Sequence, residues 1–409
     1  MLREKTLAPH EWNQIQHLIP GAEPMLHPSD SGCGSDNVRA IIPVSEPSLK
    51  GNELRYVTEC MESNWISSAG PFVKRFEEQF AAATGCEFGV ACCSGTTALH
   101  LALAALGIGP GDEVLLPTFT MVATASAVHY VGATPVLIDA EPETWNLDVV
   151  QIEAKITPRT KAIIVVHTYG HPADMDAVTA IARRHDLYVI EDAAEAHGAE
   201  YHGRPVGSLG DVACFSFYAN KIITTGEGGM VTSTNREIAG TARRLRDHAF
   251  SDERHFWHQY RGFSYRMTSL QAAVGVAQTE RLDELVERRR HNAALYRECL
   301  SGVTGLSLPQ ERLGVKNVFW MYGLIIEDGF GCSRDELRHR LARNGIETRT
   351  FFVPIHLQPV HFTHYDPNLY PVADLLCQKG MYLPSSSGLT EAEIQYVARA
   401  VKSARGQSM

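Results

Sequence analysis

The sequence has no apolar run near the ~20 residues that a membrane-spanning helix needs. Its first twelve residues, MLREKTLAPHEW, lack the apolar core of a secretory signal. Cysteine is scarce and unpatterned, with 9 in 409 residues, an odd number, and no Cys-x-x-Cys pair. These absences argue against a membrane protein and against a disulfide framework. We expect a cytoplasmic protein with reduced thiols and no membrane partner.

Positively charged residues are fewer than negatively charged ones. Lys and Arg number 37 against 47 Asp and Glu, which leaves a net charge of −10. An acidic surface argues against nucleic acid or an anionic membrane as the main partner, so an anionic substrate would need a locally positive pocket. No repeat or low-complexity tract interrupts the chain. The apolar fraction of 44% and charged fraction of 21% are typical of a globular protein, and the length of 409 residues predicts two or three structural units.

The chain divides into three parts by pattern. Residues 1–40 form an N-terminal extension that contains HPSDSGCGSD, a run of small and polar loop formers ending at Asp36. We expect this extension to be mobile or to lie on the surface. Residues 41–285 read as a large α/β domain and residues 286–409 as a smaller C-terminal α+β domain.

Short apolar runs alternate with helical stretches in the large domain. Val- and Ile-rich runs of this kind are typical of buried parallel strands, and strand–helix–strand repetition predicts a mostly parallel sheet covered on both faces. The strands are expected at 88–92, 113–117, 134–138, 162–167 and 187–192. Helices are expected at 51–63, 72–83, 97–106, 122–130, 149–156 and 175–184.

The pattern changes beyond about residue 280. Residues 281–300 read as one long helix. Ser333 with Glu336, and Thr390 with Glu393, have the spacing of capping boxes, so each pair predicts a helix start. We expect these elements to build the smaller domain.

Three groups of residues stand where strands should end, which is where open α/β sheets bind ligands. Ser94-Gly95-Thr96-Thr97 opens a helix and suits a phosphate, although helix capping alone also explains it. Asp192 and Glu195 follow a buried strand and could hold a pyridinium nitrogen, a cation or a metal, or cap a helix. Lys221 follows an aromatic strand and precedes a glycine-rich turn; such a lysine forms Schiff bases, unless it is a solvated surface charge.

The three groups together match the needs of pyridoxal 5′-phosphate (PLP). A cradle anchors the phosphate, an aspartate keeps the ring nitrogen protonated, and a lysine holds the aldehyde and later moves a proton. The histidines show no metal-ligand spacing, so we expect no metal. The sequence therefore predicts a PLP enzyme.

Several stretches resemble the DegT/DnrJ/EryC1/StrS family of sugar aminotransferases between about residues 42 and 398. They are Asn64-Trp-Ile-Ser-Ser68, Gly95-Thr-Thr-Ala-Leu-His-Leu101, Gly107-Ile-Gly-Pro-Gly-Asp-Glu-Val114, Ile190-Glu-Asp-Ala-Ala-Glu-Ala196 and Asn220-Lys-Ile-Ile-Thr-Thr-Gly-Glu-Gly-Gly229. The resemblance implies the fold type I of PLP-dependent transferases and a pyridoxamine phosphate intermediate. It also implies a homodimer with shared active sites, in which Ser264 faces across to the partner.

Site residues follow from the matched motifs. The resemblance makes Lys221 the Schiff-base lysine, Asp192 the partner of the pyridine nitrogen and Glu195 a neighbour of the ring. It makes Gly95, Thr96, Thr97 and Ser216 part of the phosphate site. Because related dehydratases carry His at the position of Lys221, the chain is expected to transaminate rather than deoxygenate.

Two positions depart from the family. Met121 stands where the family usually has an aromatic residue that stacks on the pyridine ring, and methionine can still pack there through its sulfur. Ser264 stands where the family usually has Asn reaching the neighbouring subunit's phosphate, and the shorter Ser would need a water for that contact. Both changes could be neutral, or could accompany a different substrate.

On the substrate side, the resemblance suggests Trp65, Ser67, Arg349 and His356. The branch that it favours moves an amino group from L-glutamate to carbon 4 of a GDP-linked 4-keto-6-deoxyhexose. This choice rests on Phe319-Trp-Met-Tyr322, Gly262-Phe-Ser-Tyr-Arg-Met-Thr268, Leu383-Pro384 and Gly388-Leu-Thr390. A dTDP- or UDP-linked 4-keto sugar, a keto sugar acid, and a non-catalytic sensor remain alternatives.

Overall fold

The computed structural model describes residues 5–26, 38–251, 254 and 256–405. Its centre is a seven-stranded sheet in the order β1-β9-β8-β5-β4-β2-β3. All strands run in one direction except β9, which pairs antiparallel with both of its neighbours. The strands are β1 Phe88–Cys92, β2 Glu113–Pro117, β3 Thr134–Ile138, β4 Thr160–Val166, β5 Tyr188–Asp192, β8 Val212–Ser216 and β9 Gly229–Ser233. The expected α/β fold with a mostly parallel sheet is confirmed.

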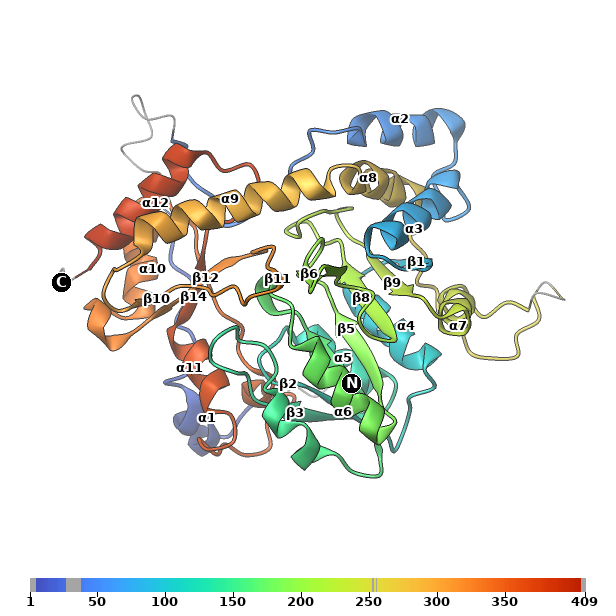
Figure 1. Ribbon diagram of the computed structural model, residues 1–409, viewed down its shortest axis with the longest axis horizontal. Coiled ribbons are helices and arrows are strands. Elements are labelled where there is room, and N and C mark those ends of the chain that lie inside the picture. The colour runs from blue at the N-terminus through green and yellow to red at the C-terminus, as the bar shows by residue number, and fades with distance from the viewer. Residues whose placement is uncertain (1–4, 27–37, 252–253, 255, 406–409) are drawn as a thin grey trace.

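Helices cover both faces of this sheet (Figure 1). Alternate strand residues point to opposite sides, so Leu115 belongs to one apolar cluster, while Val114 and Leu116 belong to the other. Because both faces are buried, the strands appear in the sequence as continuous apolar runs. The helices around the sheet are α2 Glu53–Ser63, α3 Pro71–Ala83, α4 Gly95–Ala105, α5 Val122–Tyr130, α6 Met175–His185, α7 Arg236–Arg246 and α8 Ser269–Thr279.

The helix expected over residues 149–156 is a wrong prediction. Two single 3₁₀ turns, Val149–Gln151 and Glu153–Lys155, take its place. Ile156 is already extended, and Pro158 disfavours helical conformation at the residue before it, so the stretch has no room for a regular helix.

A second, four-stranded antiparallel sheet of order β10-β12-β14-β13 is formed by the C-terminal part. The long helix α9 leaves α8 and runs toward this sheet (Figure 1), across the boundary expected near residue 285, which stays a prediction. Both capping boxes are confirmed, at Ser333 for α10 and at Thr390 for α12. The elements are α9 Leu282–Leu300, β10 Leu306–Ser307, β12 Tyr322–Ile326, α10 Arg334–Arg343, β13 Arg349–Thr350, α11 Pro371–Lys379, β14 Gly380–Leu383 and α12 Glu391–Ser403.

A small third sheet joins the two parts. Strand β11, Val315–Lys316, comes from the segment between β10 and β12 and pairs with β6, Glu200–Tyr201. Strand β6 pairs in turn with β7, Arg204–Pro205. Of the helices in the described ranges, none is long and apolar enough to cross a membrane.

The N-terminal extension is partly described. Residues 5–26 contain helix α1, Pro9–Ile15, which lies beside α11 (Figure 1). Ile15 and Leu18 are buried against Leu357, Phe362 and Cys377. This packing ties residues 5–26 to the C-terminal part, whereas residues 27–36, which hold the polar run expected to be mobile, lie outside the described residues.

Candidate active site

A cavity of about 370 Å³ opens at the carboxyl ends of the parallel strands. This is the edge where open α/β sheets bind ligands. Strand β5 delivers Asp192, strand β8 delivers Ser216, and the turn after β8 delivers Lys221. The cavity brings together seven of the expected site residues: Gly95, Thr96, Met121, Asp192, Glu195, Ser216 and Lys221.

The N-terminus of helix α4 forms one wall. Ser94 is its N-cap and accepts a hydrogen bond from the Thr97 N–H at 3.2 Å, while the Thr97 hydroxyl accepts one from the Ser94 N–H at 3.0 Å. Thr97 is thus engaged in capping, and Thr96 lines the cavity. A Cβ on Gly95 would lie 2.6 Å from Cβ of Ser216, so only glycine lets the helix end approach β8 this closely. A helix N-terminus with adjacent hydroxyls suits a phosphate.

Asp192 is a buried carboxylate at the end of β5, with 6% of its surface exposed. Its Oδ2 accepts a hydrogen bond from the Thr124 hydroxyl at 2.8 Å, and its Oδ1 accepts one from the Ala194 N–H at 3.3 Å. Burial raises the pKa of Asp192, and the bond from Thr124 partly offsets this effect. A cation placed next to this carboxylate would remove much of the cost of burying it, and a pyridinium N–H is such a cation.

Lys221 and Glu195 both line the cavity, and their charged groups lie close together. The Lys221 Nζ lies 4.0 Å from Oε1 of Glu195, and Oε2 of Glu195 accepts the Tyr169 N–H at 2.8 Å. Burial lowers the pKa of Lys221, although Glu195 and Asp192 oppose this shift. Burial also raises the pKa of Glu195 to about 7, and the charge of Lys221 opposes that shift. A lysine whose pKa is lowered has more free amine and is a better nucleophile and proton acceptor.

Met121 and Ser216 complete the cofactor-side set. Met121 is the N-cap residue of α5 and is 51% exposed. Ser216 is the last residue of β8, directly opposite Gly95. Met121 therefore presents an apolar side chain to the cavity with open space beside it.

Six expected residues do not line this cavity, and one of them is Thr97, which is engaged in helix capping. Trp65 and Ser67 are exposed in the loop after α2, and exposed Ser264 forms an isolated bridge with Asp247. The two remaining candidates are engaged elsewhere: Arg349 pairs with Glu347 and Glu23, and buried His356 lies between Thr118 at 2.7 Å and Asp374 at 2.9 Å.

Other cavity residues were not predicted from the sequence. Thr120, just before α5, lines the cavity, and its hydroxyl lies 3.1 Å from that of Thr124, which donates to Asp192. The spacing of four residues could have indicated this polar pair. Trp320 belongs to a motif used for the family resemblance, but nothing local assigns it a role. Phe352 and Tyr382 come from the C-terminal part, and no sequence signal near them indicates the cavity.

These residues fit PLP. Asp192 is a buried carboxylate that no ion pair joins to a cation in the part of the chain described. Helix α4 approaches β8 closely at Gly95. Its N-terminus and the hydroxyl-bearing residues Thr96 and Ser216 therefore line the cavity together. Lys221 reaches the same space with its amine. The donor set therefore matches a ring nitrogen, a phosphate and an aldehyde.

The chain is similar to known sugar aminotransferases over most of its length. The model of the DegT/DnrJ/EryC1/StrS aminotransferase family matches residues 47–402. GDP-perosamine synthase of Caulobacter vibrioides is 48% identical over 361 residues, 88% of this chain and 97% of the relative. GDP-perosamine synthase of Vibrio cholerae is 39% identical over 362 residues, 88% of this chain and 98% of the relative.

Solved structures of aminotransferases are also similar to this chain. DesV of S. venezuelae superposes with a TM-score of 0.82 at 35% identity, covering 93% of this chain and 98% of that one. A putative sugar aminotransferase of Streptococcus pneumoniae in its PMP form has a TM-score of 0.84 at 28% identity, covering 89% and 97%. The chain belongs to the DegT/DnrJ/EryC1/StrS family of PLP-dependent sugar aminotransferases.

Proposed function

We propose that this enzyme transfers the amino group of L-glutamate to carbon 4 of GDP-4-keto-6-deoxymannose and forms GDP-perosamine. The observation that carries the substrate is the 48% identity to a GDP-perosamine synthase over 97% of its length. Lys221 and Asp192 in one cavity support the chemistry. The products would be GDP-perosamine and 2-oxoglutarate.

The cofactor would be held by residues of this chain at three points. Thr96, Ser216 and the N-terminus of α4 bind the phosphate, Asp192 pairs with the ring nitrogen, and Met121 packs on the ring. PLP, when bound, stores the amino group between the two half-reactions and accepts electrons from the substrate carbon. Asp192 keeps the ring nitrogen protonated, because a buried carboxylate favours a cation beside it.

Lys221 moves the protons. In the first half-reaction its Nζ would take the proton from Cα of glutamate and pass it to the cofactor. In the second it would take a proton back from the cofactor and deliver it to carbon 4 of the sugar. Glu195, 4.0 Å away, stabilises the ammonium form that the lysine adopts during each transfer. The lowered pKa of Lys221 increases the share of free amine that can take up a proton.

The acceptor is tested by a single-turnover experiment. The enzyme is converted to its pyridoxamine phosphate form with glutamate, freed of glutamate, and mixed with one 4-keto nucleotide sugar at a time. We expect the PLP absorbance to return fastest with GDP-4-keto-6-deoxymannose. Faster return with a dTDP- or UDP-linked sugar would overturn the GDP assignment, and failure of glutamate to form the pyridoxamine form would overturn the donor.

We also propose a homodimer with shared sites. Ser264, Trp65 and Ser67 are exposed and lie outside the cavity of their own chain, as residues that reach a partner's site would. Lys221→Ala and Ser264→Trp chains, each impaired alone, are unfolded together and refolded. Recovered activity is expected, because one mixed site combines intact Lys221 with intact Ser264. No recovery would contradict the shared site.

A role for Arg349 and His356 in binding the substrate is a further part of this proposal. Both side chains already have partners: Arg349 has carboxylates, and His356 has Thr118 and Asp374. Direct contact with a nucleotide sugar would require these partners to be shared or exchanged. An Arg349→Gln variant with raised KM for the nucleotide sugar and unchanged KM for glutamate would support the contact.

A further inference from the structure

The indole of Trp320 lies directly against the amine of Lys221. The Nζ is 3.7 Å from the centroid of the ring system. The Trp320 Nε1–H donates a hydrogen bond to the Asn220 carbonyl at 2.9 Å, so the ring is also tied to the backbone next to the lysine. Trp320 is 4% exposed and forms part of the cavity wall. Lysine over a desolvated tryptophan face is the favourable geometry of a cation–π contact.

The backbone of Trp320 is bound by a buried arginine. Arg289 of α9 donates hydrogen bonds to the Trp320 carbonyl at 2.6 Å and to the Ser385 carbonyl at 2.9 Å. The Val318 N–H, two residues earlier, donates to the Gly170 carbonyl at 3.2 Å. These bonds restrict the backbone on both sides of the indole, so the ring does not need to be ordered by a ligand.

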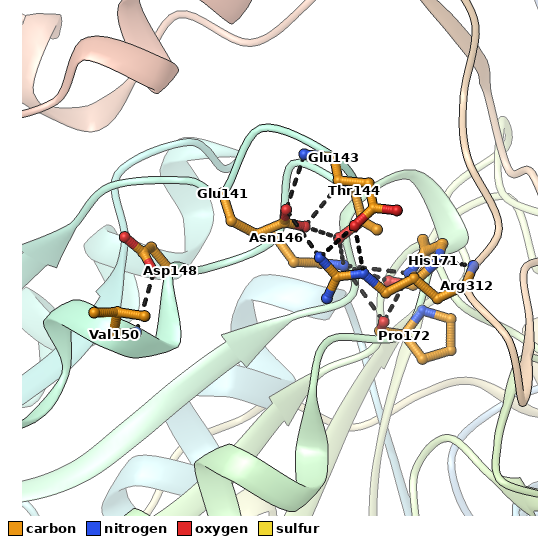
Figure 2. Close-up of polar contacts among 9 residues, drawn as sticks. All are labelled: Glu141, Glu143, Thr144, Asn146, Asp148, Val150, His171, Pro172 and Arg312. Carbon is orange, nitrogen blue, oxygen red and sulfur yellow. Dashed lines mark hydrogen bonds and ion pairs between the residues drawn. The ribbon is translucent and has the colours of Figure 1, made fainter.

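The chain before Trp320 is anchored by the polar network in Figure 2. Arg312 pairs with Glu141 and Glu143, and its backbone N–H donates to Nε2 of His171 at 3.2 Å. The side chain of Asn146 donates to the His171 carbonyl at 3.1 Å. The network fastens the segment leading to β11 and Trp320 onto the loops that follow β3 and β4, beside the cavity-lining sheet edge.

Several charged or titratable groups surround the lysine. The Glu195 carboxylate lies 4.0 Å from the Nζ, and Asp192 adds a second negative charge. The positive charge of Arg289 lowers the pKa of Lys221, whereas the two carboxylates raise it. The charge of Lys221 in turn helps to keep the pKa of buried His197 low. The lysine is therefore bordered by carboxylates and by an aromatic face.

We propose that Trp320 is a positioning residue, which holds the released amine of Lys221 against its indole, beside Glu195, while the amino group resides on the cofactor. The inference rests on the proposed role of Lys221. The indole attracts the ammonium form through its negative ring face and has much less attraction for the neutral amine. It therefore stabilises the ammonium form that Lys221 adopts during each proton transfer, and it restricts the movement of a flexible four-carbon side chain.

The test measures Lys221 itself in the full-length, cofactor-free protein. Trace acylation at a series of pH values, followed by peptide mass spectrometry, gives the apparent pKa of each lysine. Trp320→Leu removes the ring face, Trp320→Phe keeps a weaker one and loses the Nε1–H bond, and Trp145→Phe is a control at another buried tryptophan. We expect Trp320→Leu to lower the apparent pKa of Lys221 by about one pH unit, with Trp320→Phe in between and the control unchanged.

Equal shifts in Trp320→Phe and Trp320→Leu would overturn the inference, since the bond to Asn220 alone would then explain them. An unchanged Lys221 in both variants would also overturn it. Trp320→Phe preserves most of the buried volume, so it stays informative if the leucine variant does not fold. Failure of the proposed function is distinguished separately: it would appear as a Lys221→Ala variant that still transaminates.

Discussion

Glu195→Gln tests the electrostatics of the cavity most directly. The substitution replaces a buried carboxylate by a neutral amide of the same shape. The amide oxygen can still accept the Tyr169 N–H that now binds Oε2 at 2.8 Å. The charge 4.0 Å from Lys221 is lost. Packing is thus conserved, and the titration of Glu195 is removed.

The expected effect is a change in how stability depends on pH. Burial raises the pKa of Glu195 from 4.5 to about 7. Between these values the native chain keeps a proton that the unfolded chain has released, so this stabilising contribution is complete below pH 4.5 and is lost as pH rises through 7. A shift of this size corresponds to about 2–3 kcal/mol between pH 5 and 8. Glutamine contributes no such dependence.

The assay is equilibrium urea unfolding of the cofactor-free wild type and variant at pH 5, 6.5 and 8, followed by tryptophan fluorescence. The free energy of unfolding of the wild type, minus that of Glu195→Gln, should fall by about 2–3 kcal/mol over this range. Glu227→Gln is the matched control, because Glu227 lines the same cavity but is exposed. Its difference from wild type should be nearly independent of pH.

A Glu195→Gln difference that stays constant or increases with pH would refute the reasoning. The neighbouring lysine provides a second check. The charge of Lys221 lowers the pKa of Glu195, so Lys221→Met should raise that pKa further and move the loss of stability to higher pH. Movement in the other direction would contradict the effect assigned to the lysine charge.

Three further predictions concern single residues. Lys221→Ala should reduce turnover at least ~100-fold while nucleotide-sugar binding by calorimetry is retained; substantial residual transamination would exclude the lysine as the proton carrier. Met121→Phe should tighten pyridoxamine phosphate binding roughly 2–5-fold, because the half-exposed position leaves room for a stacking ring; weaker binding in a fluorescence titration would contradict this. Ile15→Ala, at a fully buried site, should cost about 2–4 kcal/mol of local stability and speed hydrogen exchange within residues 5–26; equal acceleration in the central sheet would contradict a local effect.

Local chemistry made much of the fold predictable. Most strands of the large sheet are buried on both faces, so their apolar runs indicated β1 to β5 from the sequence, whereas β9 was not predicted. The boxes at Ser333 and Thr390 act within one helical turn, and the structure forms both. The stretch at 149–156 went wrong because its helical spacing was too short to outweigh the extended backbone before Pro158.

The cofactor side of the cavity was predictable for a related reason. Asp192, Ser216 and the start of α4 stand at or just after strand ends, and parallel strands bring their carboxyl ends to one edge. For these groups, the place in the sequence therefore predicts the place in the structure. The proximity of Lys221 and Glu195 follows from the same edge, although their 4.0 Å separation does not.

Only the tertiary structure decided which C-terminal residues face the cavity. Trp320 and Tyr382 reach it because the second sheet docks against the first, and no local pattern encodes that docking. Tertiary packing also set the partners of two expected residues: Arg349 pairs with Glu347 and Glu23, and His356 lies between Thr118 and Asp374. A sequence lists charged and aromatic side chains, but contacts between residues about a hundred positions apart, such as Lys221 and Trp320, depend on how the two parts pack. The sequence thus determined the strands, the caps and the cofactor-binding edge, whereas packing of the C-terminal part determined what surrounds the lysine.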